Sequence, residues 1–477
     1  MIYGIIYKVF NLILKYKKMK YISTRGGTAP ISFSNAVMTG LARDGGLMLP
    51  EEFPCIKDKL SAWADLPYTE LAYEIMKLYA DDLTEQELRS VIEKSYATFR
   101  HPEITPTQNV GPVYILELFH GPTFAFKDVA LQFLGNMFEL ILNKTGAKLN
   151  IIAATSGDTG SAAIHGVRGR KGINIFVMHP NGRVSAVQEM QMTSVMDANV
   201  YNIAVDGTFD DAQAIVKTLF GDLNFKDKYS LGAVNSINWA RVLAQVVYYF
   251  YAGLKVMKET GSDKISFSVP TGNFGDIFAG YVAYLMGLPI DKLILATNEN
   301  DILSRFFNTG VYNVEGVHPT ISPSMDIQVA SNFERWLYLH ANRNSDQLCA
   351  WMQQFKETKS LTIGNPDELD EIMIAGKADT AKTLATIKRF YEDSKYVLDP
   401  HTAVGVSVAL DKAPTTPVIC LATAHPAKFP DAIKDATGES NLATAPEIEA
   451  LKGKPTRKFN LPADAGAVAA FVIEKLQ

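Results

Sequence analysis

Short strand-like runs that alternate with helical patterns are the feature that most constrains the fold of this chain. Beyond Gly111, apolar runs rich in β-branched residues are separated by stretches with helical periodicity. The chain predicts strands at 113–118, 149–155, 173–179, 200–205, 264–270, 291–297 and 416–423, with helices at 128–142, 161–169, 185–195, 209–220 and 236–257 between them. Strands joined through helices form parallel sheets with right-handed crossovers. We therefore expect an α/β protein.

The first part of the chain differs from the rest because it carries helical patterns without strands of comparable length. Candidate amphipathic helices cover residues 68–79 and 85–96. The sequence predicts a helical N-terminal domain over residues 19–112, followed by two open, mainly parallel αβα blocks. The smaller block is expected over residues 113–235 and the larger block over residues 236–477, without an internal repeat or a low-complexity linker.

The first eighteen residues are apolar and basic at once. Lys8 interrupts the apolar run, which is then short for a membrane span, and the remaining lysines follow the run instead of preceding it as in a secretory signal. We expect residues 1–18 to be an extra leader and Met19 to be the true start. A helix lying on a membrane surface is the alternative.

Composition excludes several classes of function. The formal net charge is −5, and no long basic run lies outside the first twenty residues, so we expect no nucleic-acid partner. Cys55, Cys349 and Cys420 lie far apart, and the eight histidines form no HExxH pattern. These features predict a reduced, cytoplasmic location without a metal site, and they indicate no membrane association.

Four unusual segments each follow a predicted strand. They are HGPTFAFKD at 120–128, SGDTG at 156–160, TGNFGD at 271–276 and ATAHPAKF at 422–429. Open parallel sheets bind ligands outside the carboxyl ends of their strands, because loops and helix N-termini converge there. We therefore expect one crevice to hold all four segments.

Two of these segments suit anions. In TGNFGD, Gly272 and Gly275 permit close backbone approach, and the following helix start offers free N–H groups, which favours a phosphate. No Lys-Ser/Thr pair follows, so a P-loop is not indicated. In SGDTG, Ser156 and Thr159 suit a carboxylate or a second phosphate. The alternatives are a plain strand-to-helix turn for TGNFGD and, for SGDTG, helix capping by Asp158 or Thr159.

Lys127 in HGPTFAFKD is the candidate reactive residue. A cation at a helix start is mildly unfavourable, and Phe124 and Phe126 would favour the neutral amine. A partly desolvated lysine is what covalent chemistry with a carbonyl requires, since only the free amine attacks. The alternative is an ordinary surface lysine.

Together the four segments resemble the threonine synthase family, which consists of pyridoxal-phosphate enzymes of the tryptophan-synthase-β-like fold group. KYISTRGG at 20–27, SPSMDIQVASNFER at 322–335 and DPHTAVG at 399–405 are also similar to that family. The resemblance extends from Met19 to the C-terminus. It implies the fold-type-II architecture of pyridoxal-phosphate enzymes, with Lys127 in the smaller block and the phosphate loop in the larger one.

The resemblance also implies roles in binding the cofactor, pyridoxal 5'-phosphate. Lys127 matches the lysine that forms the Schiff base, and Thr423 matches the hydroxyl that faces the pyridine nitrogen. The residues matching the phosphate-binding loop are Gly272, Asn273, Phe274, Gly275 and Asp276.

Substrate-binding residues follow from the same resemblance. The loop with Ser156, Asp158 and Thr159 is expected near the substrate carboxylate and the cofactor ring. The candidates for gripping the substrate phosphate are Ser236, Asn238 and Arg241. Arg241 lies in a predicted helix, so a structural ion pair is the alternative for it.

The implied reaction converts O-phospho-L-homoserine and water to L-threonine and phosphate through an external aldimine of pyridoxal phosphate, the last step of threonine biosynthesis. Freed Lys127 is the expected base for the Cα proton. Two rivals remain: a threonine-synthase-like phospholyase, and a catalytically silent pyridoxal-phosphate-binding regulatory protein. The sequence predicts a small-molecule substrate and makes no prediction of the oligomeric state.

Overall fold

A computed structural model describes residues 18–155 and 157–477 of the chain. The predicted leader therefore lies outside the described residues except for Lys18, and so does Ser156. Within the described residues, no helix is both long and apolar enough to cross a membrane.

The smaller of the two main sheets has five strands, all parallel. Their order across the sheet is β15-β7-β6-β5-β8. The strands are β5 (Leu149–Ala154), β6 (Ile173–Pro180), β7 (Val200–Asp206), β8 (Leu231–Gly232) and β15 (Phe459–Pro462). Five helices belong to this part of the molecule: α7 (Asp158–Val167), α8 (Ala186–Thr193), α9 (Phe209–Gly221), α10 (Leu223–Lys228) and α21 (Ala465–Leu476). This is the parallel, helix-covered sheet that the alternating pattern predicts.

The larger sheet has six strands in the order β13-β10-β9-β14-β4-β3. The strands are β3 (Thr107–Val110), β4 (Val113–Glu117), β9 (Ile265–Pro270), β10 (Ile290–Thr297), β13 (Met373–Lys377) and β14 (Val418–Ala422). Only β3 is antiparallel to its neighbour. Strand β9 lies in the middle with all six residues buried, as expected for a parallel strand covered on both faces.

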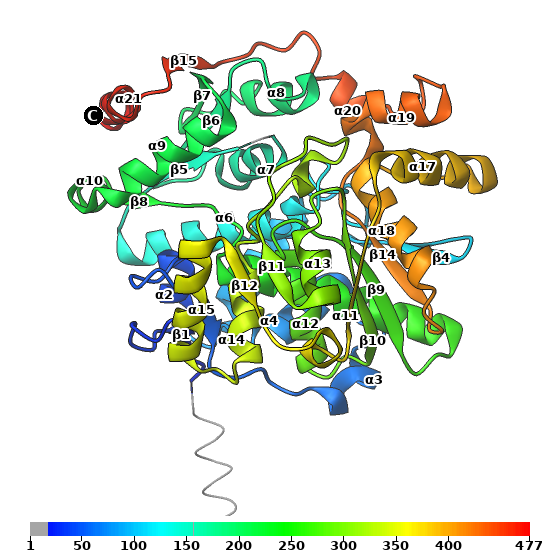
Figure 1. The fold of residues 1–477 in the computed structure, drawn as a ribbon. Coiled ribbons are helices and arrows are strands. Elements are labelled where there is room, and N and C mark those ends of the chain that lie inside the picture. Colours follow the sequence, from blue (N-terminus) through cyan, green and yellow to red (C-terminus); the bar gives the residue numbers. More distant parts are fainter. Residues whose placement is uncertain (1–17, 156) are drawn as a thin grey trace, which may run out of the picture.

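The sheets do not follow the division of the chain expected from sequence. Strand β4, expected in the block 113–235, pairs with β14 of the larger sheet, and β15, expected in the block 236–477, pairs with β7 of the smaller sheet. Figure 1 shows β15 and α21, near the C-terminus, beside β7. A strand pairs with whichever neighbouring strand offers free backbone N–H and C=O groups. The order of strands along the chain does not determine that choice.

Two long buried helices connect the two sheet regions. They are α6 (Lys127–Thr145) and α11 (Trp239–Thr260), which pack against each other. Helix α6 also contacts α7, and α11 also contacts α12 (Gly275–Leu285). The first residues of α6 and α11 lie close to the segments that sequence patterns single out, so packing of these two helices positions both halves of the site.

The N-terminal region is helical, as predicted, and it adds one short sheet. It contains α2 (Phe33–Thr39), α3 (Leu60–Trp63), α4 (Tyr68–Met76), α5 (Glu85–Tyr96) and the antiparallel pair β1 (Tyr21–Ser23) and β2 (Met48–Pro50). Helix α5 begins with a capping box in which Thr84 and Glu87 each accept the other's backbone N–H. Helix α5 packs on α6 and α4 packs on α11. Two family-like segments meet here, because Arg25 forms an ion pair of 2.8 Å with Glu334.

The remaining helices follow α11 in the chain. The helices are α13 (Ile302–Thr309), α14 (Phe333–His340), α15 (Ser345–Thr358), α16 (Pro366–Leu369), α17 (Thr380–Ser394), α18 (Pro400–Lys412), α19 (Pro430–Thr437) and α20 (Pro446–Glu449). Short 3₁₀ turns occur at η1 (Lys57–Lys59), η2 (Pro323–Met325) and η3 (Pro426–Lys428), and β11 (Val311–Asn313) pairs with β12 (Ser360–Thr362). Turns η2 and η3 contribute side chains to the site.

Candidate active site

The loop 120–128 turns back on itself and starts α6 at Lys127. Asp128 closes the loop, because its carboxylate accepts the backbone N–H of Thr123 at 2.7 Å and the Thr123 hydroxyl at 2.8 Å. The Phe126 N–H donates to the carbonyl of Thr423 at 2.8 Å. This hydrogen bond fastens the loop after β4 to the carboxyl end of β14, its neighbour in the larger sheet.

Lys127 is buried, with 9% of its surface exposed, so it is not an ordinary surface lysine. Its Nζ lies 4.7 Å from the centre of the Phe126 ring and 3.7 Å from Oδ2 of Asp158. Burial lowers the pKa of the Lys127 amine; Asp158 opposes this shift, and the charges of Lys428 and Arg241 add to it. The site therefore favours the neutral, nucleophilic amine more than water does.

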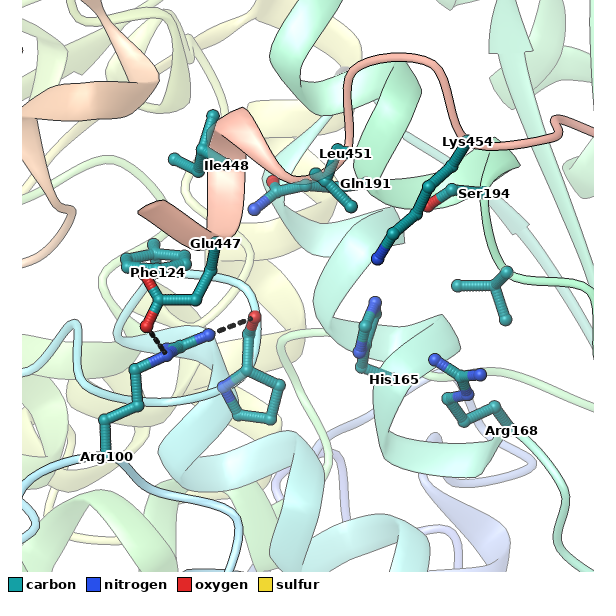
Figure 2. Close-up of a pocket in the computed structure, with 12 residues that line it drawn as sticks. Arg100, Phe124, His165, Arg168, Gln191, Ser194, Glu447, Ile448, Leu451 and Lys454 are labelled. Carbon is teal, nitrogen blue, oxygen red and sulfur yellow. Dashed lines mark hydrogen bonds and ion pairs between the residues drawn. The ribbon is translucent and has the colours of Figure 1, made fainter. Parts of the chain in front are cut away.

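Phe124, which the sequence analysis expects to favour the neutral amine of Lys127, is buried and contacts Arg100. Its ring lies under the guanidinium of Arg100, whose Cζ is 3.9 Å from the ring centre. Phe124 and Arg100 border a cavity of about 250 Å³ whose labelled residues include Glu447, the ion-pair partner of Arg100 at 3.0 Å (Figure 2). Arg100 also donates to the carbonyls of His120, Gly121 and Pro122, so it stabilises the first part of the loop that leads to Lys127.

The SGDTG turn joins β5 to α7 through an unusual glycine. Gly157 has φ of +143°, and a Cβ there would lie 2.3 Å from the Gln188 side chain, so only glycine fits. The Thr155 hydroxyl accepts the N–H groups of Gly157 and Gly160, which rounds off the turn. Neither Asp158 nor Thr159 caps the helix: Asp158 is its first residue, and the half-buried Thr159 is its second.

Asp158 is a buried carboxylate surrounded by donors. Oδ1 accepts from Lys428 at 2.7 Å and from Gln188 at 2.9 Å, and Oδ2 accepts from the Ser324 hydroxyl at 3.2 Å. Burial alone would raise the pKa of Asp158, but the charges of Lys428 and Lys127 lower it well below its usual range. An ionised carboxylate repels another carboxylate, so the side chain of Asp158 acts as a counter-ion and does not suit direct binding of a substrate carboxylate.

Sequence reasoning missed four residues around Asp158. Three of them lie in segments that carry the family resemblance: Ser324, His401 and Lys428. His401 accepts the backbone N–H of Ser324 at Nε2, and its Nδ1 lies 2.9 Å from Asp399. The fourth residue, Gln188 of α8, has no motif around it. For Ser324, His401 and Lys428 the sequence signal was that they lie in family-like segments. Such a signal does not show which residues of a segment contact Asp158.

The GNFGD turn joins β9 to α12. Phe274 has φ of +64°, and the backbone N–H groups of Asn273 and Phe274 donate to no acceptor within the described residues. Two N–H groups left free just before a helix start form the anion cradle that the sequence predicts. The glycines serve a different contact: a Cβ on Gly272 would lie 2.9 Å from the carbonyl of Ser324, and one on Gly275 would lie 3.1 Å from Asn332.

Asp276, in the first turn of α12, is held by two tyrosines. Tyr248 donates to Oδ1 at 2.5 Å, and Tyr249 donates to the same atom at 3.0 Å and to the Asp276 carbonyl at 2.9 Å. Oδ2 is buried without a partner among the described residues. Burial raises the pKa of Asp276 to about 6, against the effect of these hydrogen bonds and of the Lys127 charge.

Arg241 lies in the first turn of α11 and is buried. Its Nε and Nη1 atoms have no hydrogen-bond partner among the described residues, and no ion pair is seen there. Burial lowers the pKa of Arg241 to about 10, because a buried cation lacks the stabilisation of water. The structural ion pair considered from sequence is therefore absent within the described part of the chain. Two free donors on one guanidinium suit an anion such as phosphate.

Ser236 and Asn238 differ in what they can offer a ligand. The Ser236 hydroxyl lies 2.9 Å from that of Ser331, which in turn lies 3.1 Å from Oδ1 of Asn273. Ser236 is thereby linked to the GNFGD turn. Asn238 caps α11 with Oδ1 and donates Nδ2 to the carbonyl of Val37 at 2.8 Å. Both ends of the Asn238 side chain are engaged in holding the fold.

Thr423 is the residue that directly follows β14, at the carboxyl end of that strand. Its carbonyl accepts the Phe126 N–H, and its side chain makes no hydrogen bond to the described residues. All four segments contribute to one region: they supply the buried amine of Lys127, the ionised Asp158, the free N–H groups of the GNFGD turn, and Thr423. Arg241 of α11 adds a guanidinium with free donors. Within the described residues, no group of three His, Cys, Asp or Glu side chains is arranged to hold a metal ion.

The class of protein follows from this fold and from a family match. Residues 98–418, more than half of the chain, match the family described as pyridoxal-phosphate dependent enzyme. The chain is thus a pyridoxal-phosphate-dependent enzyme with two mainly parallel αβα blocks. The expected cofactor and fold class are confirmed.

More specific matches cover the two ends. Residues 20–96 match threonine synthase N terminus, and residues 402–472 match threonine synthase, C-terminal. Threonine synthase of Schizosaccharomyces pombe is 48% identical over 87% of this chain and 89% of its own length. The chain belongs to the threonine synthase family.

Solved structures agree with this assignment. Pyridoxal-phosphate-bound threonine synthase from Brucella melitensis superposes with a TM-score of 0.92 at 45% identity, covering 96% of this chain and 99% of that one. Threonine synthase from yeast gives a TM-score of 0.91 at 42% identity, covering 96% and 98%.

The residues present fit the cofactor. Pyridoxal phosphate has an aldehyde and a phosphate, and the site has an amine with a lowered pKa and two free backbone N–H groups at a helix start. The unpaired donors of Arg241 suit a second anion.

Proposed function

We propose that this chain converts O-phospho-L-homoserine and water into L-threonine and phosphate, with pyridoxal phosphate tethered to Lys127. The observation that carries the proposal is a buried amine in the same site as a buried guanidinium with two free donor atoms. The amine suits the cofactor's aldehyde, and the guanidinium suits the phosphate of the substrate. Membership of the threonine synthase family supports the same assignment.

The chain's own residues have distinct roles in this proposal. The N–H groups of Asn273 and Phe274 would hold the cofactor phosphate, and the Thr423 hydroxyl would be the group available to the pyridine nitrogen. A neutral hydroxyl does not require the ring nitrogen to stay protonated.

The other residues of the GNFGD loop give it its shape. Gly272 and Gly275 let the loop pack against Ser324 and Asn332, and Asp276 anchors it to two tyrosines.

Arg241 and Ser236 orient the substrate phosphate in this scheme, and the backbone and Thr159 of residues 157–160 would receive the substrate carboxylate. When bound, pyridoxal phosphate stabilises negative charge that develops on the substrate carbon skeleton. Lys127 Nζ is the group placed to hold the proton removed from Cα, because its pKa is lowered and it is shielded from water. Asn238 supports α11 and has no direct role.

Lys127→Ala tests the proposal. The wild type should bind pyridoxal phosphate with a visible absorption band and release phosphate from O-phosphohomoserine, and the variant should lose the band and nearly all phosphate release. Lys144→Ala is the matched control, since Lys144 is on the same helix but is about half exposed and pairs with Glu87. Normal turnover by the Lys127 variant would contradict the mechanism.

Product analysis separates the rivals. Threonine with equimolar phosphate supports the proposal, whereas a keto acid and ammonia would indicate a phospholyase. Cofactor binding without phosphate release would indicate the silent regulatory protein. A cytoplasmic location remains a prediction from the charge and the scattered cysteines.

A further inference from the structure

Lys428 is a buried lysine that the proposed reaction does not use. It ends the turn η3 within ATAHPAKF, and its ammonium is fully buried. It donates to the carbonyl of Thr123 at 2.9 Å and to Oδ1 of Asp158 at 2.7 Å. One ammonium group therefore joins the loop before Lys127, the turn after β5 and the segment after β14.

Asp158 lies between two lysines, and the contacts are unequal. Lys428 is at hydrogen-bond distance from Oδ1, whereas Lys127 is 3.7 Å from Oδ2. A carboxylate without Lys428 would have Lys127 as its nearest cation and would hold that amine in the charged form. A charged amine cannot attack an aldehyde.

We propose that Lys428 is a positioning residue of this site: as the counter-ion of Asp158, it leaves the Lys127 amine free to react with the cofactor. The other contacts of Asp158 are neutral, from Gln188 and Ser324. Lys428 is thus the cation in hydrogen-bond contact with the Asp158 carboxylate, and its bond to Thr123 keeps the pair next to the Lys127 loop.

Other charged groups act on Lys127 from the elements packed around it. Arg241 from α11 acts in the same direction as Lys428, and Asp276 from α12 interacts electrostatically with Lys127. His401 from α18 acts on Asp158. These groups are unchanged in the variants below, so a shift on changing Lys428 reports the loss of the Lys428 charge, which acts on Asp158 and directly on Lys127.

The test measures the pH dependence of Lys127 directly. The full-length chain is stripped of cofactor and labelled with trace acetic anhydride at a series of pH values, and the Lys127 peptide is quantified by mass spectrometry. In Lys428→Met the labelling midpoint should rise by one pH unit or more, because Asp158 then retains Lys127 as its charge partner. In Lys428→Arg it should stay within a few tenths of a unit.

Gln188→Met is the matched control for packing. It removes a hydrogen bond to the same oxygen of Asp158 without removing a charge, so the Lys127 midpoint should change by less than half a unit. A wild-type midpoint in Lys428→Met, or an equal shift in Gln188→Met, would overturn the proposal.

A double variant covers the case in which Lys428→Met does not fold. Asp158→Asn should lower the midpoint, and adding Lys428→Met to it should bring the midpoint back toward that of the wild type. A double-variant midpoint one pH unit or more above that of the wild type would overturn the proposal, because the rise would then not need the Asp158 carboxylate.

The inference rests on the proposed role of Lys127 as the cofactor's tether, and a second measurement separates the two. Cofactor uptake is followed by visible absorbance across the same pH series. Midpoints of labelling and uptake that shift together support both proposals. A labelling shift without an uptake shift would contradict the tether and leave the role of Lys428 intact.

Discussion

Two buried aspartates occupy similar places in the two halves of the site and behave in opposite ways. Asp158 begins α7 after β5, and Asp276 lies in the first turn of α12 after β9. Asp158 is bound by cations and its pKa is lowered, whereas Asp276 is bound by two tyrosines and its pKa is raised to about 6. Burial acts on both in the same direction, so the charge of the neighbours decides the outcome.

This difference suits the ligands of the two turns. The Asp158 turn holds a fixed negative charge between two lysines. The Asp276 turn is expected to receive a phosphate, and a carboxylate that protonates easily repels a phosphate less than a permanently ionised one. The two turns thus share a backbone plan, while their side-chain partners give each a different electrostatic role.

Asp158→Asn should have the largest effect. It leaves the ammonium of Lys428 buried without a counter-ion, so we expect the free energy of unfolding at pH 7 to fall by about 3–5 kcal/mol. Urea denaturation of the cofactor-free chain measures this change. Asp276→Asn is the control and should not destabilise the protein at pH 7; equal losses in both variants would break the comparison.

Gly157→Ala should cause the next largest loss of stability. The positive φ and the contact of 2.3 Å with Gln188 predict a loss of about 2–4 kcal/mol, seen as a lower urea midpoint. Gly275→Ala is the counterpart in the other turn, where the new Cβ would be 3.1 Å from a flexible amide, and it should cost less than about 1 kcal/mol. A larger loss of stability in Gly275→Ala than in Gly157→Ala would contradict the geometry described for the two turns.

Asp276→Asn should change how stability depends on pH. The folded pKa of about 6 is above the usual value of 3.8, so the folded chain holds the proton more tightly and becomes relatively less stable as pH rises through this interval. Between pH 4.5 and pH 7 the wild type should lose about 2 kcal/mol relative to Asp276→Asn in the cofactor-free state.

Asp158 provides the contrast for that measurement. Its folded pKa is below the unfolded value, so its stabilising effect is fully present above about pH 4 and is lost only at lower pH. The difference between wild type and Asp158→Asn should therefore stay nearly constant from pH 4.5 to pH 7. A slope like that of Asp276 would contradict the assignment of a permanent charge to Asp158.

Tyr248→Phe should have the smallest effect. It removes one of the two phenol hydrogen bonds to Oδ1 of Asp276, and Tyr249 still donates to that atom. We expect a loss of about 1 kcal/mol, measured by thermal or urea unfolding, and a further rise in the pKa of Asp276. A fall in that pKa would show that the tyrosine does not stabilise the carboxylate.

Much of the fold could be predicted from the sequence because the local patterns agree with the tertiary packing. The helix at 85–96 was predicted at both ends, since its apolar periodicity and its Thr84–Glu87 capping box are local signals. Strand β15 was missed because four partly exposed residues give no clear pattern, and its pairing with β7 is made across a long separation. The same limit explains why β4 was expected in the smaller block.

The site shows the same division. Local signals for strands, turns and helix starts were enough to place the four segments at strand ends, to put Lys127 next to a helix start and to predict free N–H groups in TGNFGD. Only the tertiary structure decided that Phe124 faces Arg100, that Asn238 is a cap, and that Lys428 meets Asp158. The physical reason is that burial and charge act through space between residues far apart in the chain, and a sequence pattern does not encode those distances.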